Sequence, residues 1–280
     1  MKIQRKPDWL KVQIPSGENY THLTNLIREN DVHTICQEAK CPNIAECFAK
    51  KTATFLILGN ICTRNCLYCN VSQGKPGKVD GKEPKKVANA VRILGLKYVV
   101  ITSPSRDDLN DGGVKTFIAT IKEIRKVDSE IKIELLTPDF REGIRNILKF
   151  EPNVFGHNIE TVKRLFPELR SGSNYLKSLV FLKQIKEYNP RQLTKSGFMI
   201  GLGETWQEIV ETLADLKRAK VDIVTIGQYL QPRPNLAEVK KYYTPEEFKE
   251  FEKIAKGLGI KKVYSAPLVR SSYHAEELVK

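Results

Sequence analysis

The sequence predicts an α/β protein whose core is a partial (β/α)6 barrel with an extension at each end. Two observations carry this prediction. From Thr52 onward, short runs rich in β-branched and aromatic residues alternate with amphipathic stretches of helical period. Polar, glycine-rich segments follow the predicted strands, as expected where parallel strands end at one edge. This alternation favours a parallel sheet with right-handed crossovers, and a full barrel of eight units would barely fit in 280 residues.

The predicted elements follow in chain order. Strands are expected at residues 54–60, 97–103, 131–137, 153–159, 195–203 and 222–230, with a last strand or extended segment at 261–267. Helices are expected at residues 84–95, 114–127, 174–188, 205–220 and 244–259. In the fourth of these helices, Ile209, Leu213 and Leu216 recur at helical spacing. Thr205 and Glu208 form a capping-box pattern at its start.

The chain divides into three parts on this pattern. Residues 1–51 do not fit the strand–helix alternation and are interpreted as an N-terminal extension. Residues 52–266 hold the barrel, and residues 267–280 form a C-terminal tail. The sequence has no internal repeat of fixed period and no low-complexity segment.

Composition and charge predict a globular, basic protein. The chain is 41% hydrophobic and 28% charged, with a formal net charge of +13. Because the lysines are spread along the chain and mixed with glutamate, we interpret the positive charge as that of a solvated surface. Binding of an acidic protein partner is the second interpretation. The start of the chain lacks a signal-peptide pattern, and the apolar runs 54–58 and 98–101 are too short to span a bilayer. We therefore expect a cytoplasmic protein without membrane contact.

The cysteines are clustered. All six lie in one short window and form two trios: an extension trio, Cys36, Cys41 and Cys47, at spacing C-x4-C-x5-C, and a barrel trio, Cys62, Cys66 and Cys69, at spacing C-x3-C-x2-C. A reducing compartment disfavours disulfides, so such clustering favours metal binding. Structural zinc needs four protein ligands, and neither trio has a fourth cysteine. Zinc with a distant fourth ligand, such as His33 for the extension trio, stays an alternative, as do three buried cysteines.

The barrel trio fits an iron–sulfur cluster that leaves one iron open. Three thiolates on a short loop can hold such a cluster. The open iron can then take a small molecule through an amine and a carboxylate. The missing fourth cysteine is therefore interpreted as a place left for a ligand.

C-x3-C-x2-C after the first barrel strand resembles the radical S-adenosylmethionine (radical SAM) enzymes. In that family one electron from the cluster cleaves the cofactor to a 5′-deoxyadenosyl radical. The resemblance implies contacts to S-adenosylmethionine from residues near the cysteines and at later strand ends: Tyr68, Asn158, Glu160, Met199, Gly201, Gly203 and Glu204. His157 is interpreted as a packed or hydrogen-bonded histidine, not a base.

The two trios in succession resemble the lipoyl synthase family. Segments over nearly the whole chain agree, among them residues 36–47, 102–113, 135–141, 157–170 and 267–275. The resemblance implies that two sulfur atoms are inserted at C6 and C8 of an octanoyl chain. That chain is carried on a lysine of a lipoyl carrier domain or a glycine-cleavage carrier protein. It also implies S-adenosylmethionine, two [4Fe-4S] clusters and a low-potential electron donor.

The resemblance assigns the extension trio to an auxiliary cluster that donates the sulfur. Its fourth ligand in the family is a serine of the R-S-S-Y motif, here Ser272, and Arg270 would position the tail. Further contacts to cofactor or substrate are expected at the ends of the second, third and sixth strands, from Thr102, Ser103, Arg106, Asp107, Arg141, Gln228 and Tyr229. The loop at 233–242 departs from the common family pattern, which has a His before Leu-Pro-Val.

Two other functions remain as alternatives. One is another radical SAM enzyme with an auxiliary cluster, such as a methylthiotransferase, although the chain has no room for the added RNA-binding domain. The other is a zinc-stabilised nucleic-acid-binding protein, suggested by the charge and the two trios. Because no basic patch with interleaved aromatic residues is found, we expect no nucleic-acid partner.

Overall fold

The computed structural model describes residues 5–140 and 142–279. Its main sheet has eight strands in the order β1-β2-β5-β6-β7-β8-β9-β10. Their bounds are β1 His33–Thr34, β2 Thr54–Leu56, β5 Tyr98–Thr102, β6 Lys132–Leu136, β7 Val154–Gly156, β8 Leu193–Ile200, β9 Ile223–Gln228 and β10 Lys262–Ser265. All neighbours pair in parallel except β1, which runs antiparallel to β2. A second sheet pairs β3 (Ile61–Cys62) with β4 (Ser72–Gln73).

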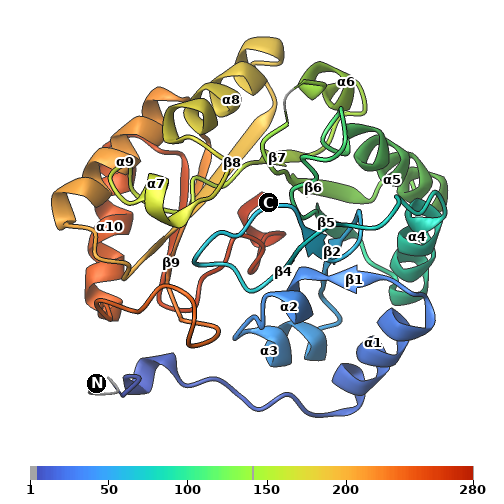
Figure 1. The fold of residues 1–280 in the computed structure, drawn as a ribbon, viewed down its shortest axis with the longest axis horizontal. Helices are drawn as coiled ribbons and strands as arrows, with labels where there is room; N and C mark the ends of the chain where they lie inside the picture. The colour runs from blue at the N-terminus through green and yellow to red at the C-terminus, as the bar shows by residue number, and fades with distance from the viewer. Residues whose placement is uncertain (1–4, 141, 280) are drawn as a thin grey trace.

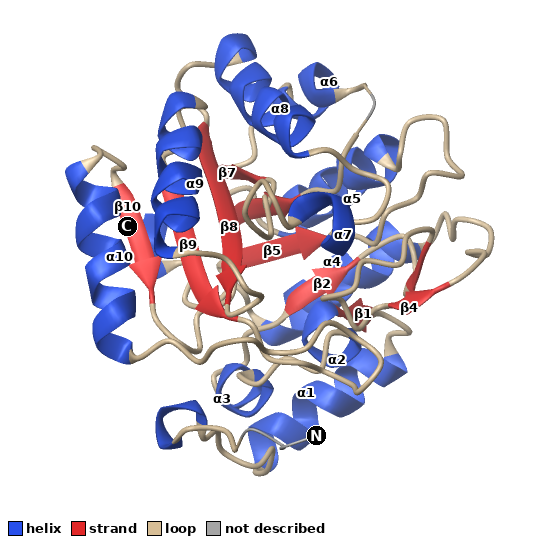
Figure 2. Ribbon diagram, turned by 60° about the vertical axis from the view of Figure 1, so that its left-hand side comes forward, coloured by secondary structure: helices blue, strands red, loops and turns tan. Residues whose placement is uncertain are grey.

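Helices connect the strands and cover the outside of the curved sheet (Figures 1 and 2). The α-helices are α1 Glu18–Glu29, α2 Ile35–Glu38, α3 Ile44–Ala49, α4 Glu83–Leu94, α5 Val114–Val127, α6 Ile144–Leu148, α7 Phe166–Leu169, α8 Tyr175–Tyr188, α9 Trp206–Arg218 and α10 Pro245–Gly257. Short 3-10 helices lie at Asp8–Leu10 and Glu277–Val279. The architecture is the predicted partial barrel.

The predicted repeat is confirmed element by element. Each of the six predicted strands overlaps an observed strand, although β8 begins at Leu193, before the predicted 195–203, and the segment at 261–267 contains a seventh parallel strand, β10. The five predicted helices are α4, α5, α8, α9 and α10. The capping box of Thr205 and Glu208 is present, and Thr244 and Glu247 form a second one on α10. Helix α1 was not predicted, although it buries Leu23, Leu26 and Ile27, because residues 1–51 were interpreted only as an extension outside the strand–helix repeat. The short helices and strands β1, β3 and β4 were not predicted either, because a few residues carry too little periodicity.

The N-terminal extension shares its core with the barrel. Leu23 of α1 and Phe48 of α3 are fully buried in the same apolar cluster as Phe55 and Val99 of the barrel strands. Strand β1 adds an antiparallel edge to the sheet, with Thr34 opposite Phe55. Residues of the extension are therefore held against the first barrel strand, which leads directly to the barrel trio.

The C-terminal tail closes the gap between the last strand and the extension. Its red ribbon overlaps the middle of the ring of strands in the view of Figure 1, and the chain ends beside β10 in Figure 2. The Asn43 side chain donates to the Leu268 carbonyl at 2.7 Å, and Lys262 Nζ donates to the Leu278 carbonyl at 2.7 Å. The tail is thereby attached both to β10 and to the loop before α3.

A charged pair is buried inside the barrel. Lys195 Nζ lies 2.8 Å from Glu134 Oε1, and the side chain of each is 1% exposed. The Tyr98 hydroxyl donates to the other carboxylate oxygen at 2.5 Å. Away from water, each polar atom of the pair needs a hydrogen-bonding partner. The contacts described here provide such partners and join β5, β6 and β8 across the barrel interior.

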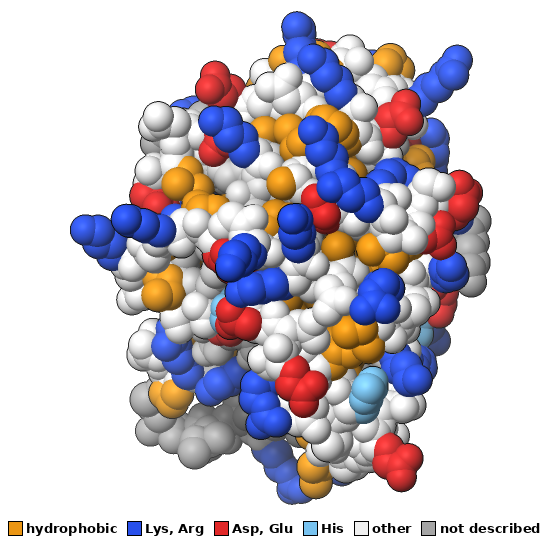
Figure 3. Space-filling model, turned by 90° about the vertical axis from the view of Figure 1, so that its right-hand side faces the viewer, with side chains coloured by type: hydrophobic (Ala, Val, Ile, Leu, Met, Phe, Trp, Pro, Cys, Tyr) orange, Lys and Arg blue, Asp and Glu red, His pale blue; other side chains and the backbone are white. Residues whose placement is uncertain are grey.

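The surface carries its charge in a mixed pattern. On the face over α4 and α5, lysine and arginine side chains are scattered among acidic ones (Figure 3). No helix in the described part of the chain combines the length and the apolar composition of a membrane span.

Candidate active site

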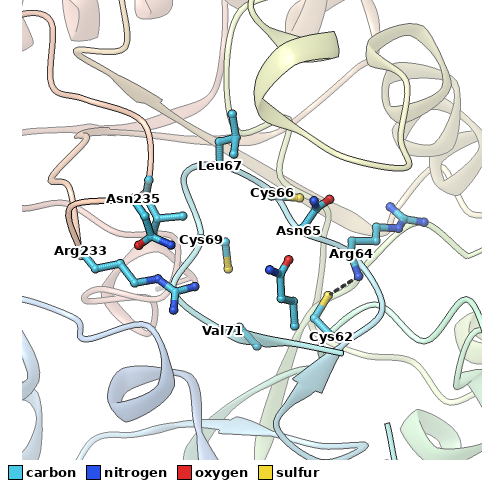
Figure 4. Close-up of a pocket in the computed structure, with 11 residues that line it drawn as sticks. Cys62, Arg64, Asn65, Cys66, Leu67, Cys69, Val71, Arg233 and Asn235 are labelled. Carbon is cyan, nitrogen blue, oxygen red and sulfur yellow. Dashed lines mark hydrogen bonds between the residues drawn. The ribbon is translucent and has the colours of Figure 1, made fainter. Parts of the chain in front are cut away.

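The barrel trio lies on the loop that joins β3 to β4. Cys62 ends β3, and Cys66 and Cys69 follow on the loop, with their sulfur atoms turned toward one cavity (Figure 4). The cavity measures about 110 Å³ and includes Arg233 and Asn235 from the segment after β9. The structure therefore brings the first and sixth strand ends together around three thiols.

Hydrogen bonds to other strand ends hold this loop. The Leu67 amide donates to the Leu169 carbonyl at 2.9 Å, and the Leu67 carbonyl accepts from the Ala237 amide at 2.8 Å. Arg64 forms a two-pronged contact with Asp107, with both distances 2.8 Å, and bonds Asp139 at 2.5 Å. The backbone amide of Arg64 also lies 3.4 Å from the Cys62 sulfur (Figure 4). Arg64 thus fixes the cysteine loop to the ends of β5 and β6.

Asp139 is the centre of a buried network. Its carboxylate contacts Arg64, Arg170 at 3.3 Å, Ser173 at 2.9 Å and His157 at 3.4 Å. Burial alone would raise the pKa of Asp139, but the His157 hydrogen bond and the two guanidinium charges outweigh it and hold the pKa far below its usual value. Asp139 therefore stays ionised and orients both arginines.

His157 has the packed role that the sequence predicted. Its side chain is fully buried, with Nδ1 at 3.0 Å from the Thr137 carbonyl and Nε2 at 3.1 Å from the Ser178 hydroxyl. Its ring also packs on Phe181 of α8. Both ring nitrogens have protein partners, so the histidine supports Asp139 and the end of β7.

Tyr68, Asn158 and Glu160 gather beside the barrel trio. Burial raises the pKa of Glu160, although Arg170 and Asn158 oppose the shift. Burial raises the pKa of Tyr68 well above its usual value, and the charge of Glu160 adds a smaller shift in the same direction. Glu160 also has a φ of 67°, a left-handed conformation that is unusual for a non-glycine residue and that clusters at functional sites.

The glycine-rich end of β8 is shaped by Glu204. Its carboxylate accepts from the Gly201 amide at 2.6 Å and from the Leu202 amide at 2.9 Å. Gly201 and Gly203 have φ angles of 107° and 106°, which side chains disfavour. Glu204 therefore holds the turn, while Met199 and the glycine backbone border the barrel interior. A cofactor contact from the glycines is a prediction that fits this geometry.

Several predicted contacts are side chains that bond the protein's own backbone. The Thr102 hydroxyl donates to the Leu136 carbonyl at 2.8 Å. Arg106 is buried and bonds Asp108 and the Leu58 carbonyl. Gln228 and Tyr229 hold the segment that follows β9, through the carbonyls of Lys241 at 2.9 Å and Ala237 at 2.7 Å.

Two other predicted residues differ from these. The Ser103 hydroxyl is buried and has no hydrogen-bond partner in the described chain, so it remains open to a ligand. Arg141 lies outside the described residues.

The extension trio lines a second cavity with the C-terminal tail. Cys36 on α2, Cys47 on α3 and Cys41 between them share this cavity with Arg270 and Ser272. Burial raises the pKa of the Cys36 thiol to about 11 and that of Cys47 to about 12. The serine and the trio, at opposite ends of the sequence, are therefore neighbours.

Neighbouring tail residues connect the two cavities. The Ser271 hydroxyl donates to Asn158 Oδ1 at 2.9 Å, beside the barrel trio. Burial lowers the pKa of Arg270, and the only charge that opposes this shift is that of Cys41. Consecutive residues of one short motif thus reach the end of β7 and the extension trio.

The three thiols of each trio are a donor set that suits an iron–sulfur cluster. All six cysteines are free thiols, and each trio faces a cavity of its own. Among the described residues, no three His, Cys, Asp or Glu side chains lie close enough together to hold one metal ion. A four-iron cluster spaces its thiolates more widely than one ion does, and its iron prefers thiolate ligands.

Comparisons with known proteins identify the family. The radical SAM superfamily profile matches residues 56–216, and the profile of the N-terminal domain of lipoyl synthase of the radical SAM family matches residues 1–41. A lipoyl synthase of Caldicellulosiruptor saccharolyticus is 49% identical over 100% of this chain and 99% of its own. One of a Geobacillus species is 50% identical over 98% of this chain and 94% of its own.

The chain belongs to the lipoyl synthase family. The predictions of a radical SAM fold, of an enzyme and of lipoyl synthase function are confirmed by these matches, and neither alternative function is favoured. Membership of the radical SAM superfamily implies one [4Fe-4S] cluster and S-adenosylmethionine.

Solved structures agree on the fold. The FeFe-hydrogenase maturase HydG of Carboxydothermus hydrogenoformans has a TM-score of 0.58 at 16% identity, over 80% of this chain and 64% of that one. Methylornithine synthase has a TM-score of 0.52 at 12% identity, over 75% of this chain and 70% of that one. At these identities the likeness extends to the barrel architecture alone.

Three residues of the site were not predicted from the sequence: Arg64, Asp139 and Arg170. They lie within segments that resemble the family, yet none was assigned a role. For Arg64 and Asp139 the one available signal was position, since Arg64 lies between Cys62 and Cys66 and Asp139 follows the end of β6, whereas Arg170 follows helix α7. Their mutual contacts, between loops far apart in the chain, have no local pattern.

Proposed function

We propose that this chain inserts two sulfur atoms at C6 and C8 of an octanoyl chain carried on a lysine of a lipoyl carrier domain or glycine-cleavage carrier protein. The observation that carries the proposal is the meeting of Ser272 with Cys36, Cys41 and Cys47 at one cavity, separate from the cavity of the barrel trio. A radical SAM enzyme that only generates a radical needs one cysteine trio. A second trio with a weak oxygen ligand suits a cluster that gives up sulfur.

The proposal divides the work among three parts of the chain. The barrel, residues 52–266, would hold a [4Fe-4S] cluster on Cys62, Cys66 and Cys69. The extension, residues 1–51, would hold the auxiliary [4Fe-4S] cluster, and the tail, residues 267–280, would add Ser272. Serine oxygen is a harder donor than cysteine and binds thiolate-preferring iron less well. A serine ligand therefore favours a cluster that can be dismantled.

The substrate carbons explain the class of chemistry. C6 and C8 of an octanoyl chain carry no activating group, so acid–base catalysis cannot remove their hydrogens. When bound, the cluster and S-adenosylmethionine supply one-electron chemistry strong enough for that step, with electrons from a low-potential donor.

The residues of the chain orient the partners of this reaction. Arg64, Asp107 and Asp139 hold the cysteine loop in place. Glu204 shapes the turn at Gly201 so that backbone groups can approach a ligand closely. Ser271 contacts Asn158 at 2.9 Å and keeps the tail near the radical-generating site. Sulfur insertion needs this proximity, because the substrate carbon must reach both cavities.

Mass spectrometry of a model substrate tests the function. The anaerobically reconstituted protein is incubated with an octanoyl-lysine peptide, S-adenosylmethionine and a reductant. The expected product is the peptide with two added sulfur atoms, and Cys66→Ala should give none. A protein that carries both clusters and cleaves S-adenosylmethionine, yet leaves the peptide without sulfur, would contradict the proposal.

A further inference from the structure

Arg233 lies at the mouth of the barrel-trio cavity and is a cation with no counter-ion in the part of the chain that the structure describes. Its guanidinium points into the cavity from the segment after β9 (Figure 4). Its Nε is buried without a hydrogen-bond partner, and the arginine forms no ion pair among the described residues. No Asp or Glu lines the cavity. A buried donor left unpaired is unfavourable, so it indicates a ligand that the cavity receives.

The segment that carries Arg233 is held rigidly. Pro232 and Pro234 flank the arginine, and a residue before proline is restricted to extended conformations. The Gln231 side chain donates to the Leu236 carbonyl at 2.8 Å, and the next amide, that of Ala237, bonds the cysteine loop. The guanidinium is thereby fixed over the cavity before any ligand arrives, which lowers the entropy lost on binding.

The other two arginines of the site are already engaged. Arg64 is paired with Asp107 and Asp139. Arg170 is buried behind the loop, where it bonds the Asn158 carbonyl and its charge acts on Cys66. Both are therefore committed to acceptors of the protein itself, whereas Arg233 has no ion pair among the described residues.

Arg233 instead lies at the outer edge of the cavity. The next residues, Pro234 and Asn235, are exposed, so this segment forms the outer rim of the cavity. The chain has a net charge of +13, which favours an acidic partner. A guanidinium with free donors binds a carboxylate through two parallel hydrogen bonds.

We propose that Arg233 binds a side-chain carboxylate next to the octanoylated lysine of the carrier protein and so selects an acidic carrier segment. This inference rests on the proposed function and adds a specificity determinant to it. It lies in the loop at 233–242, where this chain departs from the common family sequence. The occupant is thus an acidic peptide segment, presented in extended form at the rim.

A pair of peptides tests the contact in the reconstituted holo-protein. Both carry octanoyl-lysine; one has aspartate on each side of it and the other has asparagine. Binding is measured by fluorescence anisotropy, and KM by product formation. The native protein should bind the aspartate peptide at least about tenfold more tightly, as expected for charge-assisted hydrogen bonds.

Variants separate Arg233 from general electrostatics. Arg233→Gln should remove most of the preference for aspartate, and Arg233→Lys should retain part of it. Lys253→Gln removes an exposed charge of α10 and should keep the full preference. An unchanged preference in Arg233→Gln would overturn the inference.

A third measurement distinguishes the other carboxylate that could reach Arg233. The affinity for S-adenosylmethionine is compared with that for its decarboxylated analogue by calorimetry. If Arg233→Gln reduced the difference between these two and left the peptide preference intact, the arginine would bind the cofactor and the carrier assignment would be wrong. Failure of the native protein to modify either peptide would contradict the proposed function itself, a result distinct from loss of the preference.

Discussion

The Tyr273 hydroxyl donates a 2.7 Å hydrogen bond to Glu46, the residue before Cys47 on α3. His274 contacts the same carboxylate through Nε2 at 3.2 Å. The tail is therefore attached to the helix that carries one thiol of the extension trio. Because Ser272 precedes both tail residues, these contacts determine where its hydroxyl lies.

Tyr273→Phe should loosen the tail. Loss of one partly exposed hydrogen bond should lower the free energy of unfolding by about 1 kcal/mol. The larger effect should be on the auxiliary cluster, which should lose iron to a chelator several-fold faster while the cluster of the barrel trio persists. Tyr20→Phe is the control, because Tyr20 packs its ring on Phe48 and its hydroxyl has no hydrogen bond to the described residues. Equal iron loss in both variants would argue against the attachment.

Asp139→Asn should change the pH dependence of stability. The folded-state pKa of Asp139 lies below the ordinary 3.8, so its carboxylate stabilises the fold above about pH 4 and loses this contribution as the pH falls further. The variant should be about 2 kcal/mol less stable at pH 7, with a gap that narrows on acidification. Urea unfolding of the apo-protein from pH 7 to pH 3 measures this gap. A gap that stayed constant would contradict the assignment.

Glu134→Gln should destabilise the barrel by about 3–5 kcal/mol, because it leaves Lys195 charged and buried without a counter-ion. Replacing both members of the pair, by Glu134→Leu together with Lys195→Met, should restore much of the lost free energy of unfolding. A double-mutant cycle of unfolding free energies measures the coupling. Additive effects of the two single changes would show that the pair is not coupled.

The repeating part of the fold was predictable because its signals are local. Strands such as β5 and helices such as α5 alternate with a clear period, and the Thr205 capping box lies within four consecutive residues. The spacing of each cysteine trio is local too. The two cysteine sites could therefore be predicted from short stretches of sequence.

The remaining features depend on contacts between distant segments. Arg64 meets Asp139, and Ser271 meets Asn158, only after the sheet has closed. No sequence period reports such pairs. Glu204 shows a related difficulty: its place in a glycine-rich motif suggested a cofactor contact, whereas its carboxylate bonds the backbone of its own turn. The role of Ser272 came from family resemblance, since a polar tail has no signal of its own.

Ser272→Cys should make the auxiliary cluster more resistant and the enzyme slower. A fourth thiolate is a softer and stronger ligand for iron than a hydroxyl. The cluster should survive chelator treatment longer, and product analysis should show less doubly sulfurated peptide. Ser271→Cys is the neighbouring comparison: it weakens the contact with Asn158, so it should lower product formation without making the cluster more resistant to the chelator. Full product formation by Ser272→Cys would show that serine ligation is not needed.

The division of work between the two trios is tested most directly by Cys41→Ala. The anaerobically reconstituted variant is assayed for iron, 5′-deoxyadenosine and sulfur-containing peptide in one reaction. The native protein should hold about eight irons and the variant about four, as two four-iron clusters require. The variant should still produce 5′-deoxyadenosine and should insert no sulfur, whereas Cys66→Ala should do neither. Loss of 5′-deoxyadenosine in Cys41→Ala to the same degree as in Cys66→Ala, or sulfur insertion without the extension trio, would contradict the account.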